Sequence, residues 1–260
     1  MQDLLTITAL AAALFSASGA AQCARETLIE ATNKLLDAQT AGTPSTLGAP
    51  EGVVYLEQFK AADLNTGILA TPLHLDFNRS LHDTVQCATY TEMVAATGTQ
   101  HPYVVGTQMR FTPDGSSLLN VSSLVTDQGD WLFNATGTLY WASREPWDVI
   151  PEDQRDSRET IQAAADAYAD IFSDKSVTVP WGTPCARLEG GAYTGTGGPN
   201  DRCDVGIPNG VALVNRRYVI DETIGAVDVF IDFATVPDSH EFRIEKGKLR
   251  YVHTITVMGG

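Results

Sequence analysis

The sequence predicts an α+β fold built from two tandem copies of one unit, each a long helix packed on a curved antiparallel sheet. An internal repeat is the first observation, because Arg25-Glu-Thr-Leu28 recurs as Arg158-Glu-Thr-Ile161. Apolar residues at helical spacing follow each copy of this motif, and alternating strand-like segments close each copy. We therefore expect two similar halves packed together within one chain.

Each repeated motif opens a predicted amphipathic helix. The apolar positions are Leu28, Ala31, Leu35 and Ala38 in the first helix and Ile161, Ala165, Tyr168 and Phe172 in the second. Asp156, with Glu159 three residues later, forms a capping-box pattern at the start of the second helix.

The strands are predicted from alternation and turn residues. Val227, Val229, Ile231 and Phe233 alternate with Asp228 and Asp232, which predicts one dry and one wet face for this strand. Asp114-Gly115 and Lys246-Gly247 predict hairpin turns at matching places in the two copies. Two further pairs, Arg79 with Asp83 and Arg217 with Asp221, also match between the copies.

The N-terminus resembles a secretory signal. An apolar run from Leu4 to Ser16 precedes the small residues Ser18-Gly-Ala-Ala21, although this segment carries Asp3 and no basic residue. We predict a signal peptide at 1–21, a first copy at 22–126, a connector at 127–155 and a second copy at 156–260. A secreted, extracellular protein follows from this organisation.

Cysteines and glycosylation sequons agree with export. The four cysteines, Cys23, Cys87, Cys185 and Cys203, form no zinc or redox motif, which favours two disulfides. Three connectivities are possible, and the repeat favours Cys23 with Cys87 and Cys185 with Cys203. Sequons for N-glycosylation begin at Asn78, Asn120 and Asn134.

The charge restricts the partners. The chain has 17 Lys and Arg against 32 Asp and Glu, a net charge of −15, which would repel nucleic acid and anionic membranes. We expect a small-molecule ligand or substrate instead.

Several segments of the second half resemble known proteins. The range 157–257, with its helix, the loop at 179–191 and the closing hairpin, resembles the NTF2-like or SnoaL-like fold of the ketosteroid isomerase and scytalone dehydratase type. More narrowly, the segments 181–190, 238–242 and 250–253 look like a group of secreted fungal proteins of undefined function. The resemblance implies a cone-shaped pocket and acid–base chemistry that needs no cofactor. Because NTF2-like domains often pair through their sheets, it also implies that the two copies pair within one chain, and we expect a monomer with an internal pseudo-dimer.

Candidate catalytic residues lie on the last strands. His240 shares a strand face with Phe242, and His253 shares one with Tyr251, so either histidine could line a pocket as a general base. A histidine hydrogen-bonded within a half-buried sheet is the alternative.

A second candidate group precedes these strands. Asp221 and Arg217 share a face, as a base beside an anion clamp or as a structural ion pair, and Tyr218 would orient the substrate. The repeated Arg–Asp spacing in the first copy favours the structural role.

Further substrate-binding candidates surround the glycine-rich loop. Arg187, Glu189 and Tyr193 lie among glycines that suggest a mobile lid, tethered by the disulfide of Cys185 and Cys203 or merely stapled by it. Tyr168 on the second helix completes the set. We expect no metal and no organic cofactor, because no ligand set has a recognisable spacing.

Two functions remain. The first is a cofactor-independent lyase, dehydratase or isomerase that abstracts a proton from a small extracellular molecule. The second is a non-catalytic protein that binds a small ligand or carbohydrate. The catalytic hypothesis requires a histidine and a carboxylate or tyrosine to converge in one deep pocket, for which the second copy has the richer set of polar residues.

Overall fold

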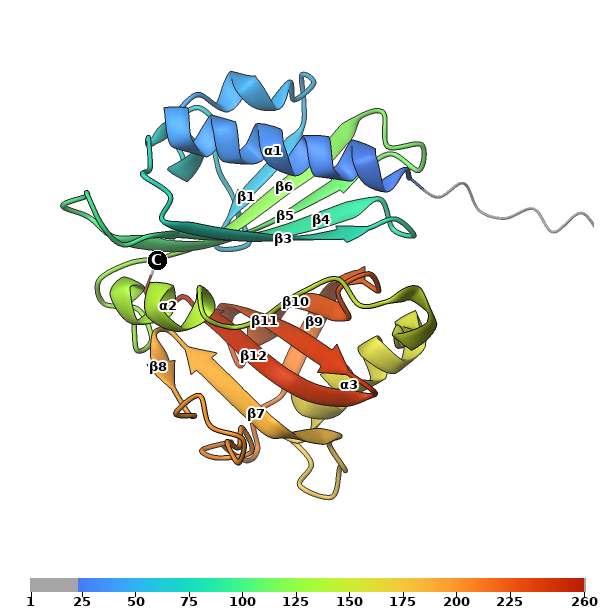
Figure 1. The fold of residues 1–260 in the computed structure, drawn as a ribbon. Coiled ribbons are helices and arrows are strands. Elements are labelled where there is room, and N and C mark those ends of the chain that lie inside the picture. The colour runs from blue at the N-terminus through green and yellow to red at the C-terminus, as the bar shows by residue number, and fades with distance from the viewer. Residues whose placement is uncertain (1–22, 260) are drawn as a thin grey trace, which may run out of the picture.

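The computed structural model describes residues 23–259 and consists of four stacked layers, helix, sheet, sheet and helix (Figure 1). Helix α1 (Arg25–Ala41) covers the outer face of the first sheet, and α3 (Arg158–Asp170) covers the outer face of the second. Helix α2 (Ala135–Ala142) lies beside the junction of the two sheets. The predicted signal peptide at 1–21 lies outside the described residues.

The first sheet has the strand order β2-β1-β6-β5-β4-β3. Its strands are β1 (Val54–Glu57), β2 (Lys60–Ala61), β3 (Phe77–Asp83), β4 (Ala88–Ala95), β5 (Tyr103–Phe111) and β6 (Leu118–Thr126). Two short 3₁₀ turns lie in the connections: η1 (Pro44–Leu47) between α1 and β1, and η2 (Ile68–Ala70) between β2 and β3.

The second sheet has the order β8-β7-β12-β11-β10-β9, the same arrangement in chain order. Its strands are β7 (Trp181–Glu189), β8 (Ala192–Tyr193), β9 (Leu213–Asp221), β10 (Ala226–Phe233), β11 (Val236–Glu245) and β12 (Lys248–Thr256). A third 3₁₀ turn, η3 (Glu152–Gln154), precedes α3.

The predicted tandem helix-on-sheet cone of the NTF2-like type is wrong. The described residues form two six-stranded mixed sheets with only three α-helices, which makes the protein a β-rich pair of sheets. Each sheet contains one parallel pair, β1 with β6 and β7 with β12. The sequence predicted a loop at 179–191, because parallel pairing between distant segments leaves no local hairpin signal.

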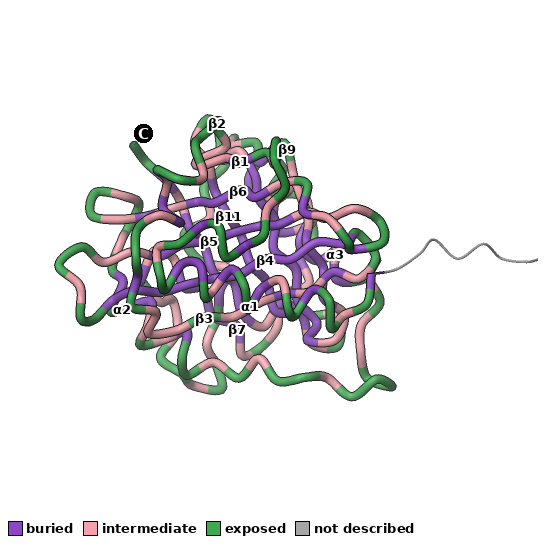
Figure 2. Tube along the Cα trace, turned by 90° about the horizontal axis from the view of Figure 1, so that it is seen from above, coloured by how far each residue is buried: buried purple, intermediate pink, exposed green. Residues whose placement is uncertain are grey.

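Apolar cores separate the four layers of the described residues. One lies under α1, one under α3, and the third lies between the sheets and takes Leu81 and Tyr90 from the first half and Val219 and Phe230 from the second. Buried backbone accordingly runs through the central strands, whereas exposed backbone lies mostly in the connecting loops (Figure 2). No helix in the range 23–259 is long and apolar enough to cross a membrane.

The packing of the sheets against each other corrects a second prediction. The β10 face with Asp228 was expected to be wet, but this side chain is fully buried and accepts hydrogen bonds from Gln108 and Ser239. Burial raises the pKa of Asp228 well above its ordinary value. Alternation identified the two faces correctly, but could not reveal that the polar face meets another sheet.

Local signals at turns and caps are mostly confirmed. Lys246 and Gly247 both have positive φ and form the two-residue β11–β12 turn. Helix α3 is capped by Ser157 rather than by the predicted Asp156, which accepts a hydrogen bond from the amide of Gly247 instead. Both expected disulfides, Cys23–Cys87 and Cys185–Cys203, are present.

Candidate functional site

A cavity of about 410 Å³ lies between α3 and the outer face of the second sheet. Its floor consists of the buried side chains Tyr168, Phe172, Arg187, Asp238, His240 and Thr254. Exposed residues form its rim, among them Trp131, Gly206, Pro208, Ala234, Thr235 and Met258. The cavity therefore runs from the surface to a buried polar end, as small-molecule sites do.

Strand register brings the polar residues of the floor together. Asp238 and His240 lie two residues apart on β11 and share a face, and their partners on β12 are Thr256 and Thr254. All four side chains line the cavity.

Asp238 and His240 form a close pair. Nδ1 of His240 lies 3.1 Å from Oδ2 of Asp238, within ion-pair distance, but the two groups are not aligned for a hydrogen bond, so both atoms lack a hydrogen-bond partner. The other carboxylate oxygen of Asp238 accepts a hydrogen bond of 2.9 Å from the hydroxyl of Thr256. The histidine ring packs beside the rings of Tyr168 and Phe172.

Arg187 and Glu189 lie on the adjacent strand β7. Nε of Arg187 is 3.2 Å from Oε2 of Glu189, and Nη1 donates to the carbonyl of Cys203. Burial raises the pKa of the Tyr168 hydroxyl to about 12, although the nearby Arg187 acts in the opposite direction. Tyr168 is therefore a neutral hydroxyl at ordinary pH.

Unpartnered polar atoms are concentrated in this cavity. Eight buried side-chain nitrogen and oxygen atoms of the described residues lack a hydrogen-bond partner. Four of the eight belong to cavity residues, namely Arg187, Asp238, His240 and Thr254. Three of these atoms lie beside an opposite charge without making a hydrogen bond to it: Nδ1 of His240 and Oδ2 of Asp238 face each other, and Nε of Arg187 faces Glu189. Because unmade hydrogen bonds of buried polar atoms cost about 1–3 kcal/mol each, their convergence on one cavity points to a ligand whose polar end would complete them.

The first half fills the equivalent place with its own chain. Glu57 and Glu189 occupy the same position in the two sheets, opposite Ser123 and Thr254 respectively. Glu57 accepts hydrogen bonds from the hydroxyl of Tyr55 and the amide of Ile68 at the start of η2. In the first half, η2 therefore lies against the glutamate that corresponds to the one lining the cavity of the second half.

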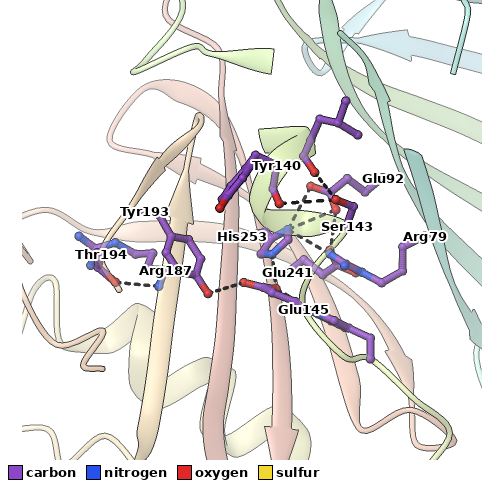
Figure 3. A network of polar contacts seen from close by, with 12 residues as sticks. Arg79, Glu92, Tyr140, Ser143, Glu145, Arg187, Tyr193, Thr194, Glu241 and His253 are labelled. Carbon is purple, nitrogen blue, oxygen red and sulfur yellow. Dashed lines mark hydrogen bonds and ion pairs between the residues drawn. The ribbon is translucent and has the colours of Figure 1, made fainter. Parts of the chain in front are cut away.

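His253, the second predicted base, lies on the opposite face of its sheet. The register of β11 with β12 places His253 opposite Glu241, between the two sheets and away from the cavity. Its Nε2 lies 2.7 Å from Oε2 of Glu145, and its Nδ1 lies 3.1 Å from Oε1 of Glu92 (Figure 3). Burial opposes protonation and Arg79 repels the ring, but the two carboxylates raise the pKa of His253 to about 10.

Arg79 completes this buried cluster. Its Nη2 donates to Glu92 at 2.7 Å and to Glu241 at 2.6 Å (Figure 3). Its guanidinium lies 3.6 Å from the centre of the Trp147 ring. Potential ligand atoms of Glu92, Glu241 and His253 lie within 4.8 Å of one another, close enough for one metal ion. Arg79 already supplies the positive charge at this point, so the cluster fits a structural ion network better than a metal site.

Asp221, the third predicted catalytic residue, also lies outside the cavity. It pairs with Arg25 at the start of α1, with two contacts of 2.7 Å, and accepts a hydrogen bond from the amide of His82. Asp83 in the first half pairs in the same way with Arg158 at the start of α3. Neither aspartate pairs with the arginine four residues before it, so the expected pairs are replaced by two reciprocal pairs between the halves.

The remaining predicted binding residues divide between the cavity and other contacts. Arg187, Glu189 and Tyr168 line the cavity, the first two from strand β7 rather than from a lid. Tyr193 stacks on Trp141 and donates to Glu145, and Tyr218 donates to Asp166 on α3. Arg217 packs over the ring of Phe59 between the halves.

Sequence reasoning missed most of the cavity residues, among them Asp238, Thr254 and Trp131. The two-residue spacing of Asp238 and His240 was a usable signal, since it places both side chains on one face of a strand. Thr254 required the β11–β12 register, and Trp131 required the connector to fold back over the second half, where its indole donates to Glu189 at 2.9 Å.

Comparison with known proteins adds one match. Residues 154–256 are similar to a family described as a domain of unknown function (DUF8021). This range contains α3, the whole second sheet and the polar floor of the cavity, but not Trp131 or Met258 on its rim. A search of curated proteins found no match.

Proposed function

We propose that the protein is a secreted, cofactor-independent lyase, dehydratase or isomerase that acts on a small molecule in the cavity between α3 and the second sheet. The convergence of unpartnered polar atoms from Arg187, Asp238, His240 and Thr254 on that one cavity carries the proposal. The lining of the same cavity includes a histidine, a carboxylate and a tyrosine, the groups that acid–base catalysis requires within one pocket.

His240 is the general base in this proposal. Asp238, beside Nδ1, favours the tautomer that carries its proton there and leaves Nε2 free to accept one. In the reaction, a C–H bond next to a carbonyl breaks, its proton moves to His240, and the electron pair moves onto the carbonyl oxygen. Asp238 then stabilises the imidazolium until the proton returns to carbon or to a leaving group.

Arg187 and Tyr168 are the proposed partners of the substrate oxygen. Arg187 offers an N–H without a hydrogen-bond partner, and Tyr168 keeps its proton because its pKa is raised. Donors of this kind stabilise a developing enolate more than a neutral carbonyl, which is how they would lower the barrier.

The extracellular location and the monomeric state are part of the same proposal. Two disulfides support an oxidising compartment, and the side chains of Asn78 and Asn134 in two of the three sequons belong to exposed residues. Small-ligand or carbohydrate binding without catalysis is the second candidate, supported by the aromatic lining of Tyr168, Phe172, Phe233 and Trp131.

Deuterium exchange tests the catalytic proposal. The probe is 2-tetralone, a small enolisable ketone, incubated with the protein in deuterated buffer and followed by NMR. We expect faster exchange than in buffer alone, and loss of at least about 90% of that excess rate in His240→Gln, since a general base contributes about 10²–10⁴-fold. His101→Gln, at an exposed histidine of the first half, should leave the rate unchanged.

Two results would count against this function. Equal exchange by the wild type and His240→Gln would exclude His240 as the base. Binding of 2-tetralone in the cavity without any exchange would favour the non-catalytic candidate.

A further inference from the structure

Resting on the proposal that this cavity is the functional site, we infer that its ligand is an uncharged, mainly apolar molecule with one polar end that both donates and accepts hydrogen bonds. The charges on the floor, the types of unpartnered atom and the apolar walls each restrict the ligand.

Charges on the floor disfavour an anion. Arg187 is the one cationic side chain of the lining besides the titratable His240, and Glu189 lies 3.2 Å from it. Asp238 is almost fully buried, so an anionic group placed at the polar end would lie close to a second negative charge. The chain as a whole, with a net charge of −15, adds no attraction for anions.

The positively charged and donor groups on the floor disfavour a cation as well. Asp238 already lies 3.1 Å from His240 and accepts a hydrogen bond from Thr256, so it does not depend on a ligand for a positive charge. Arg187, also buried, would repel a second cation at the same end of the cavity. A cationic ligand would therefore lose its hydration at this end of the cavity while lying close to the buried Arg187, which opposes its binding.

Unpartnered atoms define the hydrogen bonds that the polar end must make. Nε of Arg187 can only donate, Oδ2 of Asp238 can only accept when ionised, and the hydroxyl of Thr254 can do both. A hydroxyl group, or a carbonyl next to a hydroxyl, satisfies donors and acceptors together. A purely apolar molecule would leave all of them without partners.

The walls and the size set the rest of the molecule. Phe172, Phe233, Pro208, Val236 and Met258 provide apolar contact between the polar end and the rim. The volume of about 410 Å³ lies within the range of small-ligand sites and is large enough for a two-ring molecule.

A matched set of two-ring probes tests the charge class. The probes are 2-naphthol, naphthalene, 2-naphthoate and 2-naphthylmethylammonium, titrated into the protein at pH 7 by calorimetry. We expect 2-naphthol to bind at least about tenfold more tightly than each of the other three, because only the naphthol supplies a neutral donor and acceptor.

Two substitutions locate the polar end. Thr254→Val should weaken 2-naphthol binding about fivefold or more. The matched control is Thr89→Val, which removes another buried hydroxyl without a partner that lies in the first half and outside the cavity, and it should leave the affinity unchanged. Asp238→Asn should strengthen binding of 2-naphthoate, because it removes the repelling charge.

The outcomes separate this inference from the proposed function. Tighter or equal binding of the anion or the cation would overturn the neutral class, even if 2-tetralone exchange depends on His240. Binding of none of the four probes would overturn it as well. Preferred binding of 2-naphthol without any proton exchange would support the ligand class and reject catalysis.

Discussion

His240 and His253 lie on neighbouring strands in opposite environments. His240 faces the cavity beside one carboxylate, whereas His253 lies between the sheets with a carboxylate at each ring nitrogen. The difference arises from the strand register, because residues that pair across two strands point to the same face and their neighbours to the other. His253 is therefore a structural cation, and His240 is the histidine available to a ligand.

The raised pKa of His253 predicts a loss of stability at alkaline pH. Its folded-state pKa of about 10 exceeds the ordinary 6.5, so its stabilising contribution is complete below pH 6.5 and is lost as pH rises towards 10. The pKa values of Glu92 and Glu145 are lowered, so their contributions are lost instead as pH falls below their ordinary 4.5. We expect the free energy of unfolding to fall by a few kcal/mol between pH 7 and 10, measured by denaturant titration.

His253→Gln provides the comparison. This variant should be less stable at pH 6 and should show a flatter pH profile above pH 7, because the titrating cation is absent. A wild-type stability that stays constant up to pH 10 would contradict the buried ion network.

At the scale of elements, the connector is held against the β7–β8 hairpin by close backbone contact. Asn134 donates its amide to the carbonyl of Gly190, and the indole of Trp131 reaches Glu189 at the cavity. Gly190 has a φ of 58°, and an added Cβ would lie 2.1 Å from the carbonyl oxygen of Trp131. Glycine is required here both by the left-handed backbone and by the close approach.

Gly190→Ala should therefore destabilise the protein by about 3 kcal/mol and displace Trp131 from the cavity rim. The matched control is Gly197→Ala, since Gly197 also has a positive φ of 81° but no atom lies within 4 Å of the added Cβ. The free energy of unfolding of this control should fall by only about 1 kcal/mol. Denaturant titration measures both variants, and equal losses would show that the backbone contact has no energetic role.

At the scale of the whole molecule, two reciprocal ion pairs join the halves. Arg25 of the first half pairs with Asp221 of the second, and Arg158 of the second pairs with Asp83 of the first. Both aspartates are almost fully buried, so loss of the arginine would leave each buried carboxylate without its cationic partner. The arginine of the repeated helix motif in each half thus pairs with the repeated aspartate of the other half.

Removal of one arginine should therefore destabilise both halves together. We expect Arg158→Met to lower the free energy of unfolding by about 3 kcal/mol, because it leaves Asp83 buried without its cation. Arg202→Met, in the exposed pair of Arg202 with Asp204, should change it by less than about 1 kcal/mol. Circular dichroism and tryptophan fluorescence should report one coincident transition for each variant, and separate transitions would mean that the halves unfold independently.

The sequence by itself determined the features that depend on neighbouring residues. It correctly predicted the helices opened by the two arginine motifs, the alternation of β10 and β11, the Lys246–Gly247 turn and both disulfides. It also selected His240, Arg187, Glu189 and Tyr168, which line the cavity. Each of these follows from local periodicity, turn chemistry or residue type.

Only the tertiary structure decided which faces and strands meet. The parallel pairing of β7 with β12 turned a predicted loop into the strand that carries Arg187 and Glu189, and the β11–β12 register placed His253 and His240 on opposite faces. The packing of sheet on sheet buried Asp228 and joined Asp221 to Arg25. These outcomes depend on contacts between residues far apart in the chain, and such contacts leave no periodic signal in the segments that make them.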